Sequence, residues 1–291
     1  IDELGIGVIR DAFADTLFPG ISTIQTRPKY FLRTLHLLDH YRKLPPQTKK
    51  RKSLEQYLEE QELEDRIQLF QTHAASGDIG IIGGTFEARR DRNVMRRPSS
   101  IYWNGLCKFN MVRPNELSLA EFGRRLREAH SLHSLLEATA NDKGDDADAL
   151  DHTRDLQIDP PPGKDLQRSE LSIHLTTNEA VYLKDKIVQQ QGSQLLGQLL
   201  EDSKAIDEIL LLPTSRRFKD LAALPCIDRL DHPTQQIVQH ALKFWQLFKG
   251  AHIRYNCMLQ KQFGTPQKLA EFDEKWEAWK GSITSYLEGW D

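Results

Sequence analysis

A cluster of positive and aromatic side chains within residues 89–103 is the strongest chemical feature of the sequence. Guanidinium groups bind phosphate oxygens through paired hydrogen bonds, and neighbouring aromatic rings can stack on unpaired bases. Pro98 predicts a helix start, whose first amide groups would also favour an anion. The pattern predicts contact with nucleic-acid phosphates, and a solvated basic loop is the alternative. The residues concerned are Arg89, Arg90, Arg92, Arg96, Arg97 and Trp103.

A second basic cluster lies between two expected helices and consists of Lys49, Lys50, Arg51 and Lys52. Such a loop can touch a phosphate backbone without reading its base sequence. A solvated loop is again the alternative. The nucleic-acid hypothesis requires both clusters to lie on one face, where they would form a single cationic surface.

Other chemical motifs are weaker. The helices on either side of Pro19 and Gly20 suggest a helix-turn-helix, but their connection is longer than usual, which favours simple helix packing. No phosphate-binding loop, hydrolase motif or kinase signature is present, so the sequence supports no named enzyme class and no cofactor. Two histidine pairs have helical spacing without a third ligand nearby, which leaves a metal site unsupported. These pairs are His36 with His40, and His130 with His133.

The composition bounds the class of protein. Hydrophobic residues make up 39% and charged residues 28% of 291 residues, which excludes wholesale disorder. No apolar run approaches the roughly 20 residues that cross a bilayer, so we expect no membrane partner. The three cysteines are widely spaced, which favours a reducing cytoplasm over a disulfide framework. The chain begins at Ile1 inside an expected helix, so we expect upstream residues to be missing.

Hydrophobic periodicity predicts an almost entirely α-helical protein. Capping boxes at Ser118 with Glu121 and at Thr176 with Glu179 mark two helix starts. No sustained alternating pattern indicates a β-sheet. We expect long helices at residues 4–18, 28–43, 53–76, 98–110, 118–140, 176–191, 233–262 and 265–286, with short helices at 193–201, 203–211 and 215–224.

An acidic segment divides the sequence. Residues 141–163 carry seven aspartates and end in Pro160-Pro161-Pro162-Gly163. A segment of this composition buries too little apolar surface to offset its ordering, which is typical of a linker. Residues 1–140 are net basic, and the remainder of the chain, which includes this segment, is net acidic. We therefore predict two helical domains, 1–140 and 169–291, joined by an acidic, Pro-rich linker at 141–168.

The opening run, D-E-L-G-I-G-x-I-R-D-A-F-A-D-x-L-F-P-G-x-S-T-I-Q-T-R at positions 2–27, resembles the start of a bacterial family classified as a domain of unknown function. Residues 97–106 and 251–259 also resemble it, while Arg33 and Thr34 depart from it. The resemblance covers most of the chain. It implies an accessory protein found beside helicases or nucleases in defence-type gene neighbourhoods, and it assigns no site residue.

Two functions follow as expectations. The first is a non-catalytic accessory protein of a bacterial DNA-transaction or phage-defence system, which contacts DNA or RNA through the arginine and lysine clusters and accompanies a helicase or nuclease subunit. The alternative is a protein–protein scaffold or adaptor, which uses the aromatic carboxy-terminal helices and makes no nucleic-acid contact.

Overall fold

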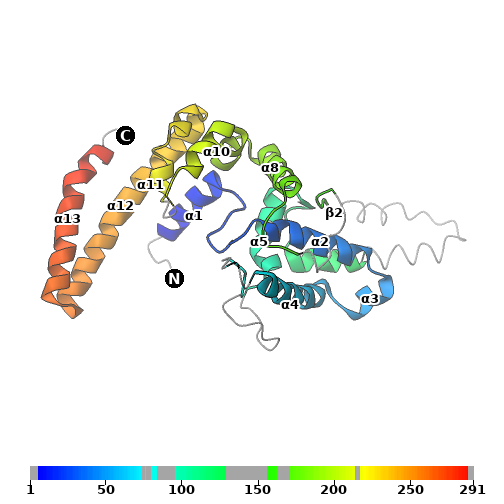
Figure 1. The fold of residues 1–291 in the computed structure, drawn as a ribbon. Coiled ribbons are helices and arrows are strands. Elements are labelled where there is room, and N and C mark those ends of the chain that lie inside the picture. The colour runs from blue at the N-terminus through cyan, green and yellow to red at the C-terminus, as the bar shows by residue number, and fades with distance from the viewer. Residues whose placement is uncertain are drawn as a thin grey trace, which may run out of the picture. The chain divides into compact units, whose positions relative to one another are not determined.

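The computed structural model is all-α in the part that it describes, and its only strands are two short ones, β1 and β2 (Figure 1). This confirms the predicted fold class. None of the described helices is both long and apolar enough to cross a bilayer. The described residues are 6–73, 76, 80–83, 96–128, 156–162, 171–213 and 217–287.

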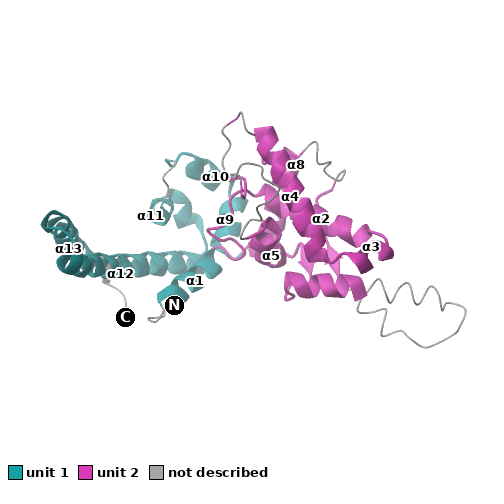
Figure 2. Cartoon of the chain, turned by 90° about the horizontal axis from the view of Figure 1, so that it is seen from below, with its two compact units in different colours: residues 1–17, 193–291 teal, residues 18–192 magenta. Residues whose placement is uncertain are grey.

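The chain divides into two compact units (Figure 2). Unit 2 comprises residues 18–192, whereas unit 1 combines residues 1–17 with 193–291. This division differs from the predicted domains, because described residues on both sides of the acidic segment belong to unit 2. Ile158 and Leu171, for example, are both buried there. The apolar residues around the acidic segment explain why it does not separate two domains.

Unit 2 is built around α2 (Lys29–Lys43), which is buried along most of its length. Leu32, Leu35, Leu38 and Tyr41 are completely buried, because apolar residues occupy more than one face of this helix. Four helical segments of the same unit are α3 (Pro46–Arg51), α4 (Leu54–His73), α5 (Pro98–Lys108) and residues 119–128.

Helices α2 and α5 approach each other closely. A Cβ atom at Gly105 would lie 2.4 Å from the Phe31 ring, so only glycine permits this packing. The Tyr102 hydroxyl accepts hydrogen bonds from the amides of Thr26 and Arg27, at 2.8 and 3.0 Å, and donates to the Arg27 carbonyl. This tyrosine therefore fixes the segment that leads into α2.

Two further elements complete unit 2. Strand β1 (Val112–Arg113) pairs antiparallel with β2 (Gln157–Ile158), and Val112 lies opposite Ile158. Helix α8 (Thr177–Gln191) begins at the predicted capping box. The Thr176 hydroxyl accepts from the Glu179 amide, and the Glu179 carboxylate accepts from the Thr176 amide. Both ends of this box satisfy amides that the helix itself leaves unpaired.

Unit 1 joins the first helix to the last part of the chain. Helix α1 (Ile6–Leu17) packs on α12 (His232–Phe263), and the Phe13 and Phe244 rings lie 5.6 Å apart. Helices α1 and α2 thus belong to different units and form no helix-turn-helix pair within one of them. The other elements of unit 1 are α9 (Leu195–Glu201), α10 (Ser203–Leu210), α11 (Phe218–Leu221), a 3-10 helix η2 (Pro225–Arg229) and α13 (Pro266–Leu287).

Helices α12 and α13 form an antiparallel hairpin (Figure 1). A Cβ atom at Gly250 would lie 2.1 Å from the Trp279 ring, so the indole lies directly against the α12 backbone. The Trp279 indole N–H donates to the Gln246 carbonyl at 2.8 Å. Asp231 caps the start of α12 by accepting the Thr234 amide. The hairpin is thus held by a glycine-to-tryptophan contact.

Candidate functional site

The predicted basic cluster at residues 49–52 is only partly exposed. Lys49 is buried and donates to the Arg42 carbonyl, and Lys52 pairs with Glu60. Burial, with the nearby Arg42 charge, lowers the pKa of Lys49 to about 8. Lys50 and Arg51 are exposed at the end of α3. Two of the four residues of this predicted cluster, Lys49 and Lys52, therefore make polar contacts within the protein.

The second predicted cluster is described only in part, because Arg89, Arg90 and Arg92 lie outside the described residues. Arg96 is exposed. Arg97 donates to the Glu55 carbonyl at 3.2 Å, and its guanidinium lies 3.4 Å from the Glu59 carboxylate. The structure thus leaves Arg96 as the exposed cation of this cluster among the described residues.

Trp103 lies in the core of unit 2. Its ring packs against Phe122 with centroids 5.3 Å apart, and its indole N–H donates to the Leu117 carbonyl at 2.8 Å. The prediction that Trp103 stacks on bases does not fit this burial. Its apolar neighbours and internal hydrogen bond explain the position.

Helix α12 carries a second apolar face, opposite the one that packs on α13. Positions 241, 244, 248, 251, 255 and 258 follow the alternating three- and four-residue spacing of a coiled-coil seam. Ala241 is buried and Phe244 contacts Phe13 of α1. We call the remaining four residues the outer stripe, namely Phe248, Ala251, Tyr255 and Met258.

The outer stripe is exposed over nearly three helical turns. Phe248, Tyr255 and Met258 are 39%, 60% and 62% exposed, and a continuous row of exposed apolar side chains is typical of an interaction surface. Phe248 also stacks on Phe244, with centroids 6.3 Å apart. The stripe therefore continues directly from the part of α12 that α1 covers.

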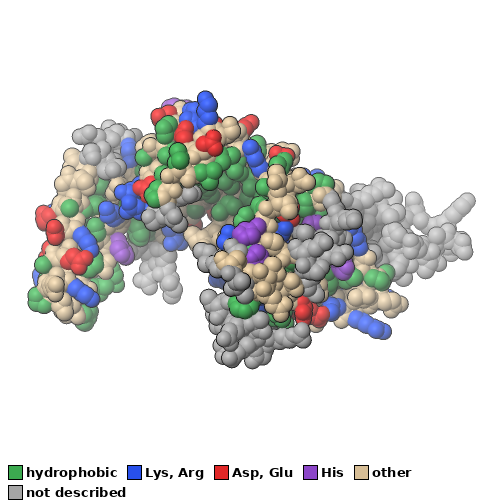
Figure 3. Space-filling model, viewed as in Figure 1, with side chains coloured by type: hydrophobic (Ala, Val, Ile, Leu, Met, Phe, Trp, Pro, Cys, Tyr) green, Lys and Arg blue, Asp and Glu red, His purple; other side chains and the backbone are tan. Residues whose placement is uncertain are grey.

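The charges around the outer stripe have one sign. Helix α12 spans 32 residues without an aspartate or glutamate. At 100° per residue, Arg254 and Lys261 lie beside one edge of the stripe, and the Arg254 guanidinium lies over the Trp276 ring of α13, 5.5 Å from its centroid. Lys249 lies farther around the helix beyond the other edge, over the Trp245 ring. Helix α13, by contrast, mixes acidic and basic side chains, which alternate along it in the space-filling view (Figure 3). Positive charge thus flanks an apolar row.

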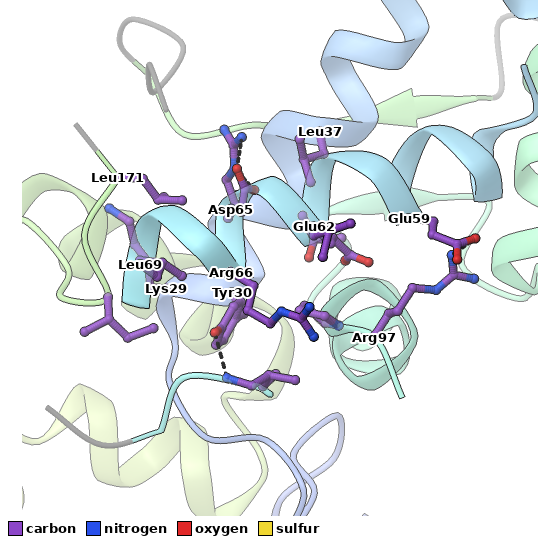
Figure 4. A pocket seen from close by; sticks show the side chains of 16 residues that line it. Lys29, Tyr30, Leu37, Glu59, Glu62, Asp65, Arg66, Leu69, Arg97 and Leu171 are labelled. Atoms are coloured by element: carbon purple, nitrogen blue, oxygen red, sulfur yellow. Dashed lines mark hydrogen bonds and ion pairs between the residues drawn. The ribbon is translucent and has the colours of Figure 1, made fainter. Parts of the chain in front are cut away.

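A cavity of about 40 Å³ lies inside unit 2, between α2, α4 and the start of α5 (Figure 4). Leucine, isoleucine and charged side chains line it together. Lys29 donates to both carboxylate oxygens of Glu179, and Arg33 makes a bidentate pair with Asp65. The residues that line the cavity include Lys29, Tyr30, Arg33, Glu59, Glu62, Asp65, Arg66, Arg97, Leu37, Leu69, Leu171 and Ile173.

Among the acidic residues that line this cavity, Glu62 has the pKa that is shifted most clearly from its ordinary value. Burial raises its pKa to about 7, although hydrogen bonds from Ser99 and the Arg97 charge act in the opposite direction. The Ser99 amide donates to one carboxylate oxygen at 2.6 Å, and the Ser99 hydroxyl lies 3.2 Å from the other. A carboxyl group that titrates near neutrality inside a cavity is a candidate functional group.

The remaining candidates give no site. In the described part of the chain, no group of three or more histidine, cysteine or acidic residues is placed to hold a metal ion. His36 is buried, and His40 Nδ1 lies 2.6 Å from the Tyr57 hydroxyl, while His130 and His133 lie outside the described residues. Cys107 is buried, which raises its pKa to about 11 and disfavours a reactive thiolate.

Neither the outer stripe nor the cavity was among the sites predicted from the sequence. The heptad spacing from position 241 to position 258 was a readable signal for the stripe. The cavity had no local signal, because its charges come from helices far apart in the sequence, and charged residues on α4 look like an ordinary solvated face.

Comparisons with known proteins identify the family of this protein, but they identify no activity, ligand or partner. No curated protein and no solved structure matches the chain significantly. A family model covers residues 1–274. Because the match extends over nearly the whole chain, the protein belongs to a family of unknown function, DUF6361.

Proposed function

We propose that the protein is a helical adaptor, which binds an amphipathic helix of another protein along the outer stripe of α12. The observation that carries this proposal is the row of exposed apolar side chains at coiled-coil spacing. Such a row buries its apolar groups when a second helix lies against it and places its side chains between those of the stripe. Met258 adapts its shape to a partner, as methionines on helix-binding surfaces do.

Helix α1 illustrates the kind of helix that this face accepts. It covers the earlier part of the same row through Phe13, while its Asp11 pairs with its own Arg10. A partner helix beyond α1 would continue that packing. Because Lys249, Arg254 and Lys261 flank the stripe, acidic residues on the edges of the partner helix would be favoured.

A second copy of the stripe is a poorer partner. Helix α12 has only positive flanking residues, so two copies of it would bring like charges together. The partner we propose is therefore a different protein with an acidic amphipathic helix. The resemblance described above supports a subunit of a DNA-transaction or defence system, such as a helicase or nuclease.

The experiment uses two designed peptides of four heptads with leucine at the core positions. One carries glutamate and the other lysine at the flanking positions. We expect the glutamate peptide to bind the full chain in fluorescence anisotropy and the lysine peptide not to bind. The variant Tyr255→Glu with Met258→Glu should weaken binding by about tenfold or more. Reversing Lys249, Arg254 and Lys261 to glutamate should switch the preference to the lysine peptide.

Val181→Glu is the matched control, because Val181 is an exposed apolar residue of α8 in unit 2, 51% exposed. This variant should bind the glutamate peptide as the wild type does. Equal binding of both peptides, or binding of neither by folded protein, would refute the adaptor proposal. Binding of single-stranded DNA that Tyr255→Glu abolishes would instead reassign the stripe to nucleic acid.

A further inference from the structure

The outer stripe of α12 contains one small residue between large ones. Ala251 lies between Phe248 and Tyr255 in the row, and Met258 follows one turn after the tyrosine. Ala251 is exposed, so the neighbouring rings leave it accessible. Phe248 stacks on Phe244, which precedes it by one turn, rather than on the side of Ala251. The row of large side chains therefore has a low point at Ala251, where a side chain of another helix can approach α12.

Phe248 and Tyr255 limit how closely a second helix can pack on α12. They are seven residues apart, which corresponds to about 10.5 Å along the helix axis. Because a large side chain lies on each side of Ala251, a partner helix cannot move closer to fill the space above the alanine. A small partner residue at this place would leave a cavity. A leucine there would have less volume opposite it than a leucine that faces either ring, so it too would fill the space incompletely.

Helix α1 shows how this row accepts a helix. Ala241, ten residues before Ala251, is a small residue of the same row and is buried, and Phe244 follows it by one turn. Phe13 is the only aromatic residue of α1, and its ring lies 5.6 Å from that of Phe244. The helix that the protein itself places on this row therefore contacts it through an aromatic side chain, one turn from a small residue.

We propose that Ala251 selects partner helices that carry an aromatic residue at the core position opposite it. The aromatic side chain fills the space between Phe248 and Tyr255, so that large and small residues face each other across the two helices. Aromatic residues in well-packed positions also contribute most to binding at many interfaces. This inference rests on the proposed adaptor function, and it adds the residue that determines which acidic amphipathic helices bind.

Three labelled peptides test the proposal on the full chain by fluorescence anisotropy. The first is the four-heptad glutamate peptide with leucine at every core position. The second carries tryptophan in place of one central core leucine. The third carries the tryptophan at a central surface position instead, which controls for a general effect of its hydrophobicity. We expect the second peptide to bind about tenfold more tightly than the first, and the third to bind like the first.

Two alanine-to-leucine variants locate the effect. Ala251→Leu fills the low point with the protein's own side chain, so the peptide with the core tryptophan should bind this variant no more tightly than the leucine peptide does. Ala278→Leu is the matched control, since Ala278 is an exposed alanine of α13, on the other helix of the hairpin. It should keep the wild-type preference. Leucine favours helix nearly as well as alanine, so both variants should fold.

The results separate this inference from the adaptor proposal. If folded wild-type protein binds neither the leucine peptide nor the peptide with the core tryptophan, the adaptor function is wrong, and this inference with it. If both bind and the leucine peptide binds at least as tightly, the adaptor function stands and selection by Ala251 is refuted. A preference for the core tryptophan that Ala251→Leu retains would also refute it, because the indole would then pack elsewhere on the stripe.

Discussion

The Lys29 ammonium group donates to both carboxylate oxygens of Glu179, at 2.6 and 2.8 Å, and thereby ties α2 to α8 across 150 residues of sequence. Both side chains are buried. Burial alone would raise the pKa of Glu179, but the hydrogen bonds from Lys29 and from the Thr176 amide lower it below its ordinary value. The lowered pKa keeps the Glu179 carboxylate ionised in the interior of unit 2.

Lys29→Met should destabilise unit 2 by about 3–5 kcal/mol, because it leaves the Glu179 charge buried without its partner. Lys29→Met combined with Glu179→Gln should cost less than the sum of the single changes, since the double variant buries no isolated charge. Urea unfolding measures both. Lys275→Met serves as the control, because the Lys275–Glu271 pair is exposed to solvent and should contribute little to stability. Additive effects at Lys29 and Glu179 would argue against their coupling.

The Glu62 carboxyl group should make stability depend on pH. Its pKa is about 7 in the folded protein and 4.5 in the unfolded reference, so the folded state binds the proton more tightly. The stabilisation is complete below pH 4.5 and is lost as pH rises to about 7, by about 3 kcal/mol in total. Glu62→Gln should remove this part of the pH dependence in urea unfolding between pH 5 and 8. A wild type and variant with parallel pH profiles would exclude a neutral Glu62 in the folded state.

Gly250→Ala should open the α12–α13 hairpin. The added Cβ atom would meet the Trp279 ring at 2.1 Å, so the helices must separate, at a cost of about 1–3 kcal/mol. Gly281→Ala is the natural control, since no atom lies within 4 Å of its added Cβ. That change should stabilise α13 by about 0.5–1 kcal/mol, because alanine favours helix over glycine. Thermal unfolding followed by tryptophan fluorescence compares the two.

The nucleic-acid hypothesis stays a prediction for the exposed described cations Lys50, Arg51 and Arg96. If they contact phosphates, changing all three to glutamine should reduce the salt dependence of DNA binding by about three contacts, with a slope change of about 0.9 each for duplex DNA. Gel-shift titrations at several salt concentrations measure this slope. Lys52→Gln is a suitable comparison, because Lys52 already pairs with Glu60. An unchanged slope in the triple variant would exclude these cations as the contact.

Local sequence patterns predicted the helices well. Proline and capping residues located the starts of α5 and α8, and apolar periodicity located α12 and α13. The division into units was missed, because the contact of Phe13 with Phe244 joins residues far apart in sequence and has no local signature. The burial of Glu62 and Lys29 also has no local signature, because their hydrogen-bond partners, Ser99 and Glu179, come from distant segments of the sequence.

Unit 1 has a consequence for how the chain is made. Helix α1 is translated before unit 2, whereas the helix that receives Phe13 is translated only after residues 18–192. All residues of unit 2 are therefore translated before α12, the helix on which α1 packs, has been made. A nascent chain that stalls before residue 232 carries α1 without the helix on which it packs, so we expect chaperones to bind α1 during translation.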